Sequence, residues 1–455
     1  MDTIYALATP PGRSALAIIR ISGPGTGDIL SALSVKMPCP IRTPVLSMIH
    51  NPETQDILDQ AVILNFKAPS SFTGEDAAEI TLHGGPAVVA GVMEALSKNK
   101  KCRMAEPGEF TKRAFLNNKM DLTQAEAIAD LTSAETRLQR RQALSQLSGS
   151  LKDIYDGFRD QMVRIGAYTE AHLDFPDEDL PTNLLDQVRP QIESLIKNIK
   201  EHLSDAHVGE RVRDGFKTVI IGSPNAGKST LLNALSARDV AIVSPIPGTT
   251  RDVIDVHLDV GGYPVVLSDT AGIRSGTSDI IEAEGMRRAG QRIKESDIQI
   301  FVFDVLELLF GGIDFSLFPN PMDGTILVLN KVDQIQDERV SAKKIRDMLP
   351  SSFQGVPHVM TSLQEKGGVD KITSAIRTYL EKISEGHEGA VLTRSRHREA
   401  LIEVLSSLQT ASCQTEPELL SEELRAAIQQ IGRITGRVDI DDILDIIFRD
   451  FCIGK

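Results

Sequence analysis

The stretch Gly222 to Thr230, GSPNAGKST, constrains the fold of this chain more than any other. It matches the pattern G-x-x-x-x-G-K-[ST], follows the apolar run TVII and precedes the helix-like LLNAL. Gly222 and Gly227 allow the backbone to wrap closely, so that its N–H groups and the helix N-terminus meet phosphate oxygens. The motif predicts an α/β domain in which Lys228 contacts phosphates and Ser229 offers a hydroxyl to Mg²⁺.

Strand-like runs surround this loop in the pattern of a parallel sheet. The candidates are KTVIIG, VIDVHLDV, PVVLSD, IQIFVFD, TILVLN and PHVMTS. Gly261-Gly262 predicts a hairpin turn between the second and third of these. We therefore expect a doubly wound, mostly parallel sheet with one antiparallel strand, as in Ras-like P-loop domains.

Two further motifs at strand ends indicate which nucleotide binds. Asp269 ends a strand and opens D-T-A-G, where it can hold a magnesium-bound water and Gly272 can donate to a γ-phosphate. Asn330-Lys331-Val332-Asp333 follows TILVL, and an aspartate there can accept from N1–H and the N2 amino group of guanine. Adenine lacks both donors, so the motif favours GTP over ATP. Ser362 is a candidate for the base edge, although Ser362-Leu363-Gln364 departs from the usual S-A-K/R.

The loop after D-T-A-G lacks the glutamine that orients the attacking water in Ras-like enzymes. Ile273 stands at that position, and its alkyl chain can neither donate to water nor accept from it. Glu282 and Glu284 both follow in the same loop, and the residues alone leave the choice between them open.

Four segments are expected along the 455 residues. Residues 1–118 mix short strand-like runs with a helix from Ala87 to Lys98, which predicts an α/β domain. Residues 119–211 are helical, with a capping box expected at Thr123-Gln124-Ala125-Glu126. Residues 212–384 form the P-loop domain, and residues 385–455 return to helices. Helices on both sides predict that the P-loop domain is inserted into a helical domain.

Composition limits the remaining classes. The sequence contains no apolar run that is long enough to span a membrane, and its first residues carry no signal-type segment. We therefore expect a cytoplasmic protein. The net charge of −14 argues against general nucleic-acid binding, although Arg137, Arg140 and Arg141, or Arg394, Arg396 and Arg398, could form a local patch. Such clusters are more often solvated helix faces. The four cysteines form no metal-binding pair, and Cys452 is at most a reactive thiol near the chain end.

Several stretches together resemble one family. They are ATPPGR from Ala8, FTGEDAAEITLHGG from Phe72, AEPGEFTKRAFLNNKMDLTQAEAIADL from Ala105, PGTTRD from Pro247, and the terminal CIGK. The chain resembles, over nearly its whole length, the MnmE (TrmE) family of tRNA modification GTPases, within the TrmE-Era-EngA-like superfamily.

The resemblance implies a GTP site in which a hydrophobic residue replaces the glutamine, two G domains meet, and a potassium ion lies against the phosphates. It implies K⁺ contacts from the Asn225 side chain and from the carbonyls of Ser244, Ile246 and Thr249, while Thr250 reaches Mg²⁺. Glu282 matches the family's water-orienting glutamate, with Glu284 the competing choice. The implied GTP contacts are Asn225, Ala226, Gly227, Lys228, Ser229, Thr230, Ser244, Thr249, Thr250, Asp269, Thr270, Ala271, Gly272, Asn330, Lys331, Asp333 and Ser362. Asn225 as a turn-stabilising residue and Glu282 as an ordinary helix-start residue are the plainer alternatives.

For the N-terminal domain, the resemblance implies a tetrahydrofolate derivative, 5-formyl- or methylene-tetrahydrofolate, surrounded by Arg20, Glu79, Lys119 and Lys455. His83, before a Gly-Gly turn, is an acid–base candidate that is more often structural. The resemblance also implies a homodimer, and a heterotetramer with the flavoprotein MnmG (GidA) that carboxymethylaminomethylates C5 of the tRNA wobble uridine.

Two other functional classes share these motifs. One is an RNA- or ribosome-assembly GTPase switch, which should carry a basic RNA-binding module. The other is a folate-dependent one-carbon transferase that its G domain regulates. GTP turnover that rises with K⁺ but not with Na⁺ would favour a potassium-dependent, tRNA-modifying GTPase over both of these classes.

Overall fold

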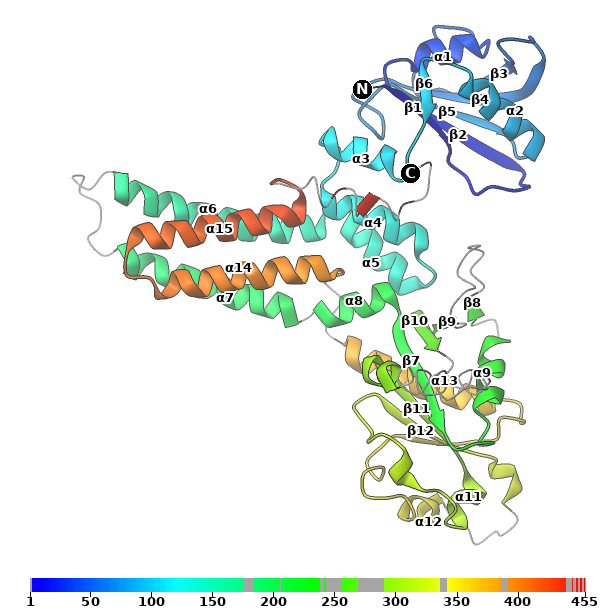
Figure 1. Ribbon diagram of the computed structural model, residues 1–455, viewed down its shortest axis with the longest axis vertical. Helices are drawn as coiled ribbons and strands as arrows, with labels where there is room; N and C mark the ends of the chain where they lie inside the picture. The colour runs from blue at the N-terminus through cyan, green and yellow to red at the C-terminus, as the bar shows by residue number, and fades with distance from the viewer. Residues whose placement is uncertain are drawn as a thin grey trace, which may run out of the picture. The chain divides into compact units, whose positions relative to one another are not determined.

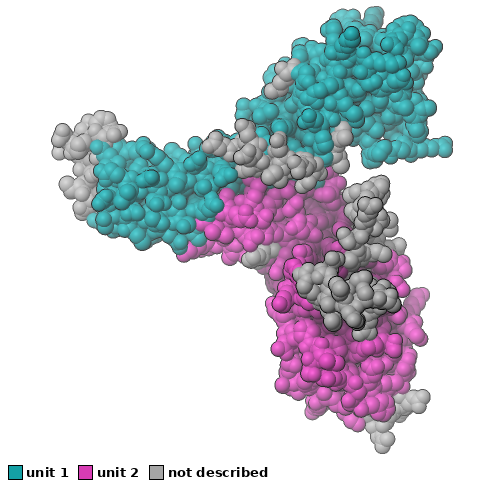
Figure 2. Space-filling view, viewed as in Figure 1, with its two compact units in different colours: residues 1–129, 146–193, 403–455 teal, residues 130–145, 194–402 magenta. Residues whose placement is uncertain are grey.

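The computed structural model describes residues 2–174, 184–204, 206–237, 241–242, 255–268, 290–335, 342–385 and 392–438, together with residues 444, 447, 448, 451 and 454. The chain forms two compact units (Figures 1 and 2). The first contains residues 1–129, 146–193 and 403–455, and the second contains residues 130–145 and 194–402.

The first unit begins with a six-stranded sheet in the order β3-β4-β5-β2-β1-β6. Its strands are β1 (Thr3–Leu7), β2 (Leu16–Ser22), β3 (Val45–His50), β4 (Ile57–Phe66), β5 (Ala77–His83) and β6 (Cys102–Met104). Only β1 and β6 pair in parallel. One face packs under α1 (Thr26–Ala32) and α2 (Pro86–Ser97), with Ile19, Ile63 and Ile80 fully buried in that core. The mixed α/β character expected for this segment is confirmed.

The sequence patterns missed four elements of this segment: α1, β3, β6 and α3 (Glu109–Leu116). The case of α3 shows why. Its buried side chains are Glu109, Thr111 and Arg113 together with Phe110, Ala114 and Phe115, so polar and charged residues interrupt the apolar stripe of this eight-residue helix. In β3, the side chains of Leu46 and Met48 are exposed, which removes the usual alternation of apolar-in and polar-out residues.

Besides α3, the residues that the structure describes form several longer helices in the helical part of the chain. They are α4 (Leu122–Ser133), α5 (Arg137–Leu147), α6 (Ser150–Asp174), α7 (Leu184–Ser204), α14 (Ser395–Cys413) and α15 (Pro417–Thr435). A short helix, α8 (Ala206–Asp214), follows α7 and leads into the second sheet.

The capping box expected to begin at Thr123 is wrong, because the box begins two residues earlier, at Asp121. Asp121 caps α4 instead, because its Oδ1 accepts from the backbone N–H of Gln124 at 2.8 Å. Gln124 returns the bond, accepting from the backbone N–H of Asp121 at 3.1 Å. This reciprocal pair is the capping-box arrangement with Asp in place of Ser or Thr. Thr123 lies inside the helix and donates to Asp121.

Helices from before and after the second sheet contact one another within the first unit. Arg189 of α7 donates to the carbonyls of Ser412 and Gln414, at the end of α14, at 3.0 and 3.1 Å. Glu170 of α6 pairs with Arg425 of α15 at 2.6 Å. Segments more than 200 residues apart therefore build one helical layer, as expected if the P-loop segment interrupts it.

The second unit contains a seven-stranded sheet in the order β13-β12-β11-β7-β10-β9-β8. Its strands are β7 (Phe216–Gly222), β8 (Ala241–Ile242), β9 (Asp255–Val260), β10 (Tyr263–Ser268), β11 (Ile298–Asp304), β12 (Thr325–Asn330) and β13 (His358–Met360). β9 runs antiparallel to both of its neighbours, whereas the pairs from β10 to β13 are parallel. Gly261 and Gly262 have φ of +66° and +98° and join Val260 to Tyr263 in a two-residue hairpin. The predicted sheet and turn are confirmed.

Helices cover both faces of this sheet. They are α9 (Lys228–Ser236), α11 (Val305–Leu309), α12 (Ala342–Asp347) and α13 (Gly368–Ser384), with 3-10 turns at Phe315–Leu317 and Val332–Gln334. The unusually apolar segment from 306 to 324 acquires an explanation here. Phe315 and Phe318 pack edge-on against Phe303, at ring-centroid distances of 5.3 and 5.1 Å, and so extend the core of one sheet face, whereas Phe310 and Leu317 of the same segment are exposed.

Candidate functional site

The phosphate loop lies between β7 and α9, as its sequence predicts. Lys228 starts α9, and its Nζ donates to the carbonyls of Gly222 and Ser223 at 2.9 and 2.6 Å. The ammonium group therefore already lies over the loop that would surround a phosphate. Asn225 has a φ of +63° and an exposed side chain, and Ser229 is exposed in the first turn of α9. The loop presents an amide and a hydroxyl outward while its cation is held across it.

Two glycines of this loop have no room for a side chain. A Cβ on Gly222 would lie 1.9 Å from the carbonyl oxygen of Val302 in β11. A Cβ on Gly227 would lie 2.4 Å from Nδ2 of Asn330, and Gly227 has a φ of +105°. The glycines are required because the loop packs directly on the neighbouring strand ends.

The Asn330-Lys331-x-Asp333 motif joins three loops at the carboxyl end of the sheet. Asn330 is 4% exposed, donates through Nδ2 to the carbonyl of Ala226 at 2.8 Å, and accepts through Oδ1 from the N–H of Leu363 at 3.1 Å. Lys331 donates to Asp304 at 2.7 Å.

The Asp333 side chain is exposed beside this scaffold. Asn330 and Lys331 therefore serve as structural ties, whereas the predicted contact of Asp333 with a guanine base stays a prediction. The expectation that these motifs meet at strand ends of one sheet is confirmed for Gly222, Asn330 and the segment after β13.

Ser362 is almost fully buried, and its Oγ accepts from the backbone N–H of Gln364 at 3.4 Å. A Cβ on Gly368 would lie 1.9 Å from the carbonyl oxygen of Ser362, so the loop from 361 to 368 is closely folded. The contact of Ser362 with the edge of the guanine base stays a prediction.

Several predicted site residues lie outside the described residues. They are Ser244, Ile246, Thr249, Thr250, Asp269, Thr270, Ala271, Gly272, Ile273, Glu282, Glu284, Cys452 and Lys455. Of the predicted GTP and metal contacts, the structure describes those of the phosphate loop, the 330–333 motif and Ser362.

In the first unit, two of the residues proposed for a one-carbon carrier touch. Arg20 and Glu79 are cross-strand partners on β2 and β5, and the guanidinium donates through Nε and Nη2 to Oε1 of Glu79 at 3.1 and 2.9 Å. The guanidinium carbon of Arg20 also lies 5.4 Å from the ring centre of Phe72, whose side chain is 40% exposed. Lys119 donates to the carbonyl of Pro69, in the loop that carries Phe72.

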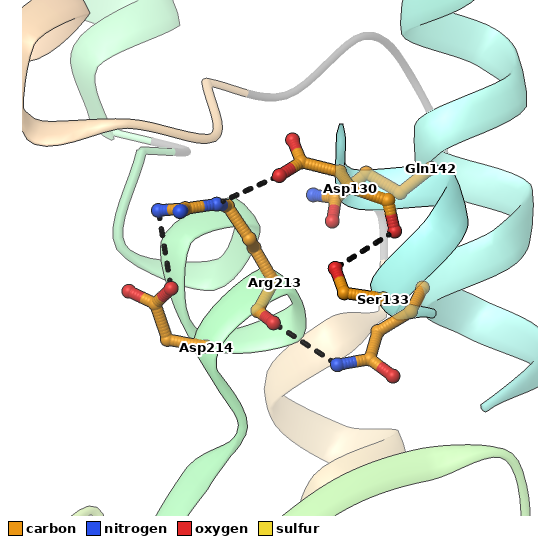
Figure 3. Close-up of a pocket in the computed structure, with 6 residues that line it drawn as sticks. Asp130, Ser133, Gln142, Arg213 and Asp214 are labelled. Carbon is orange, nitrogen blue, oxygen red and sulfur yellow. Dashed lines mark hydrogen bonds and ion pairs between the residues drawn. The ribbon is translucent and has the colours of Figure 1, made fainter. Parts of the chain in front are cut away.

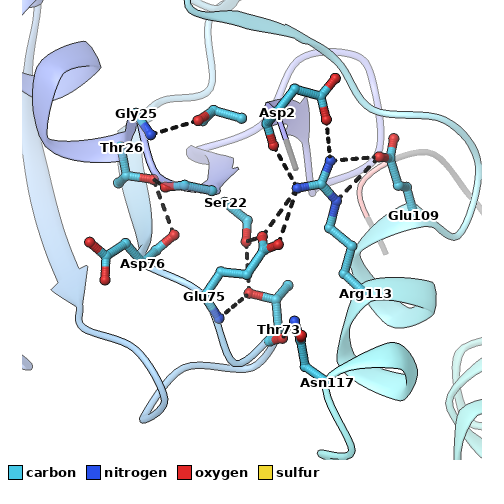
Figure 4. Close-up of polar contacts among 12 residues, drawn as sticks. Asp2, Ser22, Gly25, Thr26, Thr73, Glu75, Asp76, Glu109, Arg113 and Asn117 are labelled. Atoms are coloured by element: carbon cyan, nitrogen blue, oxygen red, sulfur yellow. Dashed lines mark hydrogen bonds and ion pairs between the residues drawn. The ribbon is translucent and has the colours of Figure 1, made fainter.

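A buried ion-pair network that the sequence did not reveal holds this loop (Figure 4). Arg113 of α3 lies at its centre and pairs with Asp2 at 2.8 Å, Glu109 at 2.9 Å and Glu75 at 3.2 Å. Burial raises the pKa of Glu109, but hydrogen bonds from Arg103, from the Glu106 N–H and from Arg113 outweigh it and lower that pKa below its ordinary value. An E-x-x-x-R spacing on one helix was the available signal, and it is too common to identify such a network.

The network reaches the loop through Glu75. Glu75 accepts from Ser22 Oγ at 2.7 Å, and Asn117 donates to the carbonyl of Thr73 at 2.7 Å. The loop from 71 to 76 is therefore fixed to both β2 and α3. Gly454 lies beside the same sheet, because a Cβ on it would be 2.4 Å from the carbonyl oxygen of Leu7.

His83 has a defined partner. Its Nδ1 lies 2.8 Å from Oδ1 of Asp59, and its backbone N–H donates to Oδ2 of the same carboxylate at 2.8 Å. The double contact fixes the ring at the end of β5, which is the structural role that we considered more common for such a histidine.

A phosphate-binding loop, a base-reading Asn-Lys-x-Asp motif and a mostly parallel sheet with one antiparallel strand define a P-loop GTPase. Comparisons with known proteins narrow this class. The "MnmE helical domain" family model matches residues 122–452, and the model "GTP-binding protein TrmE N-terminus" matches residues 3–119. The chain is 46% identical to the tRNA modification GTPase MnmE of Paramagnetospirillum magneticum, 45% to that of Rhodospirillum rubrum and 42% to that of Rickettsia canadensis, each across all of both chains.

The chain therefore belongs to the MnmE (TrmE) family. It is a GTP hydrolase, because its full-length relatives are named tRNA modification GTPases and its own chain forms the strand, loop and helix of a P-loop. Among the residues that the structure describes, no helix is both long and apolar enough to span a membrane.

Proposed function

We propose that this chain is a potassium-dependent GTP hydrolase that, with a flavoprotein partner of the MnmG type, modifies C5 of the tRNA wobble uridine using a folate-borne carbon. The observation that carries this proposal is the full-length similarity to relatives named tRNA modification GTPase MnmE. The proposal is supported by the presence, in one chain, of a P-loop and of an N-terminal sheet with exposed Phe72 and the Arg20–Glu79 pair.

The donor groups of the phosphate loop fit the two proposed cations. The Ser229 hydroxyl is exposed in the first helical turn, where Mg²⁺ is held in P-loop enzymes, and the Asn225 amide is exposed on a left-handed backbone at the loop tip. Both are oxygen donors, which hard cations prefer. A potassium ion there would neutralise negative charge that develops as the β–γ bond of GTP breaks.

The attacking water needs a positioning group because Ile273 cannot supply one. We assign that role to Glu282, with Glu284 as the competing residue. Steady-state GTP hydrolysis is measured in KCl and in NaCl for the wild type, Glu282→Ala and Glu284→Ala. We expect turnover in KCl only, with loss in Glu282→Ala while GDP affinity is retained. Turnover that is equal in both salts would contradict the mechanism.

The N-terminal sheet offers groups that fit a reduced folate. Among the described residues, both Arg20 nitrogens that bond Glu79 share Oε1, so Oε2 is left to accept from the N–H edge of a pterin. Phe72 presents part of its ring beside Arg20, and Lys119 and Lys455 are cations for carboxylates of the ligand. Bound folate would supply the methylene carbon.

Direct binding of 5-formyl-tetrahydrofolate tests this site. We expect Glu79→Gln to weaken binding, measured by isothermal titration, by at least about tenfold, because one charge-assisted hydrogen bond is lost. Glu94→Gln, an exposed change on α2, is the matched control. Equal binding by both variants would remove the folate assignment and leave the GTPase assignment untouched.

The proposed homodimer is supported by the second face of the N-terminal sheet. Its side chains alternate away from the helix-covered core, and they include exposed apolar groups on neighbouring strands: Leu46, Met48 and Val62. An exposed apolar sheet face of this kind favours pairing with a second copy. Analytical ultracentrifugation should show a dimer of the wild type and a monomer of Val62→Asp.

One measurement separates the proposal from the two other classes. Wobble uridine in tRNA is analysed by mass spectrometry from cells that carry the wild type or a Lys228→Ala variant. Loss of the C5 group in the variant supports the proposal, whereas intact modification with defective ribosome assembly would favour an assembly switch. Modification that persists without GTP hydrolysis would favour a transferase that the G domain only regulates.

A further inference from the structure

Helix α5 carries a concentrated positive charge in an acidic chain. Arg137, Arg140 and Arg141 lie on it, and no Asp or Glu occurs from Thr136 to Lys152, although the chain as a whole has a net charge of −14. Their spacing of three and four residues places them on one helix face. All three side chains are exposed, and none forms an ion pair with a residue that the structure describes.

The opposite face of α5 is anchored through glutamines. Gln139 donates to the carbonyl of Arg213 and Gln142 to that of Gly209, both at 3.0 Å. A small polar pocket lies here, lined by both glutamines, Arg213, Asp130, Ser133 and Asp214 (Figure 3). Because hydrogen bonds fix the inner face, the arginines are held outward on a helix of defined orientation.

Three carboxylates on neighbouring elements are already engaged. Asp130 accepts from Arg213 and Arg394 at 3.1 and 2.7 Å. Glu135 contacts His257 at 2.9 Å, and Asp259 accepts from the N–H of Gly262 at 2.6 Å. Nothing among them neutralises the three guanidinium groups.

The competing basic cluster does not share this property. Arg394 is bound to Asp130, and Arg398 pairs with Glu210 at 3.1 Å. Those arginines are half-buried structural ties, so of the two clusters that the sequence suggests, only the α5 face stays available to an external anion.

We propose that the face of α5 formed by Arg137, Arg140 and Arg141 binds the phosphate backbone of tRNA. The inference rests on the proposed function for the identity of the polyanion. Arginine presents several N–H donors in a plane, which suits phosphate oxygens better than a single ammonium group does. A strongly acidic protein that acts on tRNA needs such a local cationic surface to overcome its own charge.

The first turn of α5 also contacts the nucleotide-binding sheet. The backbone N–H of Leu138 donates to the carbonyl of Gly262, in the β9–β10 hairpin, at 3.2 Å. This hairpin connects the segment that contains Thr250 with the segment that begins at Asp269. The helix that would bind RNA therefore contacts the hairpin that links the segment with the predicted Mg²⁺ ligand Thr250 to the segment with the predicted γ-phosphate contact Gly272.

The test measures binding of an unmodified tRNA transcript to the full-length chain by fluorescence anisotropy over a series of salt concentrations. We expect the triple variant R137Q/R140Q/R141Q to bind about tenfold or more weakly at low salt. The slope of log affinity against log salt should fall by about 2 to 3, since each phosphate contact contributes about 0.7 to 0.9. An unchanged thermal unfolding midpoint establishes that the variant folds.

Two controls make the result specific. The variant K343Q/K371Q/K382Q loses the same charge from exposed lysines elsewhere in the second unit and should keep wild-type affinity. R137K/R140K/R141K keeps the charge and should recover most of the salt slope. Equal loss in the lysine control would show a net-charge effect and overturn the proposal.

The remaining outcomes are equally decisive. Wild-type affinity in the arginine-to-glutamine variant, or no salt-dependent tRNA binding by the wild type, refutes the assignment. Intact tRNA binding with loss of flavoprotein binding would show that the face binds an acidic protein instead. The proposed function is judged separately, by potassium-dependent GTP turnover and uridine modification in the wild type.

Discussion

Replacing Asn330 by aspartate tests whether this buried side chain sets the shape of the phosphate loop. The change keeps the acceptor for the Leu363 N–H but replaces the donor that reaches the Ala226 carbonyl with an oxygen. A buried carbonyl left unpaired costs about 1 to 3 kcal/mol, and a charged oxygen facing it adds to that. We therefore expect a loss of about 2 to 4 kcal/mol.

If the substitution destabilises the shape of the phosphate loop that binds nucleotide, guanine-nucleotide affinity should fall by roughly 30- to 1,000-fold. Equilibrium titration with a fluorescent GDP analogue measures the affinity, and urea unfolding of the nucleotide-free protein measures stability. Asn233→Asp makes the same change at an exposed position of α9 and should alter neither by more than about twofold. A variant that loses stability but binds GDP within threefold of the wild type would refute the argument that Asn330 shapes the loop.

Other expected outcomes concern the base, the N-terminal network and a packed glycine. Asp333→Ala removes two charge-assisted hydrogen bonds to guanine, about 3 kcal/mol in total, so its GDP affinity should fall roughly 100-fold; an unchanged preference for guanine over inosine nucleotides would exclude that contact. Glu109 has a lowered pKa in the folded state, so its contribution to stability is complete above its ordinary pKa of 4.5 and is lost as pH falls through the lower folded value. Urea unfolding from pH 7 to 3 should therefore show a weaker pH dependence for Glu109→Gln than for the wild type, and parallel curves would contradict the network. Gly436→Ala places a Cβ 2.7 Å from the Phe115 ring at a φ of +83°, so it should cost about 2 to 3 kcal/mol in the same assay. Gly166→Ala lies inside α6, where the added Cβ meets no atom of another element within 4 Å, and should keep or raise stability by up to about 1 kcal/mol.

The sequence predicted the strands, turns and loops around the phosphate loop well because the information for them is local. The phosphate loop, the Gly261-Gly262 hairpin and the motif at Asn330 each occupy a few consecutive residues at a strand end, where backbone geometry demands particular side chains. The sequence did not reveal which distant group each of these residues contacts, such as the Ala226 carbonyl that accepts a hydrogen bond from Asn330.

The N-terminal domain was harder to predict for a physical reason. Its α3 buries Arg113, whose partners Asp2 and Glu75 are distant in sequence, beside Phe110 and Phe115. Hydrophobic periodicity carries no information about the ion pairs through which part of this helix packs. The cap of α4 was misplaced for a related reason, since both Asp121 and Thr123 are capping residue types and only the geometry distinguishes them.

Asp130 gives the inserted segment an unusual attachment. Two arginines donate to the same oxygen of this carboxylate. Arg213 lies where the chain enters the P-loop segment, at the end of α8, and Arg394 lies where the chain returns from it. The two crossings of the chain into and out of the P-loop segment therefore meet at one atom. A gene fragment cut at these crossings would encode a module whose ends already lie together, so it could be transplanted, or replaced by another domain, without long connecting sequences.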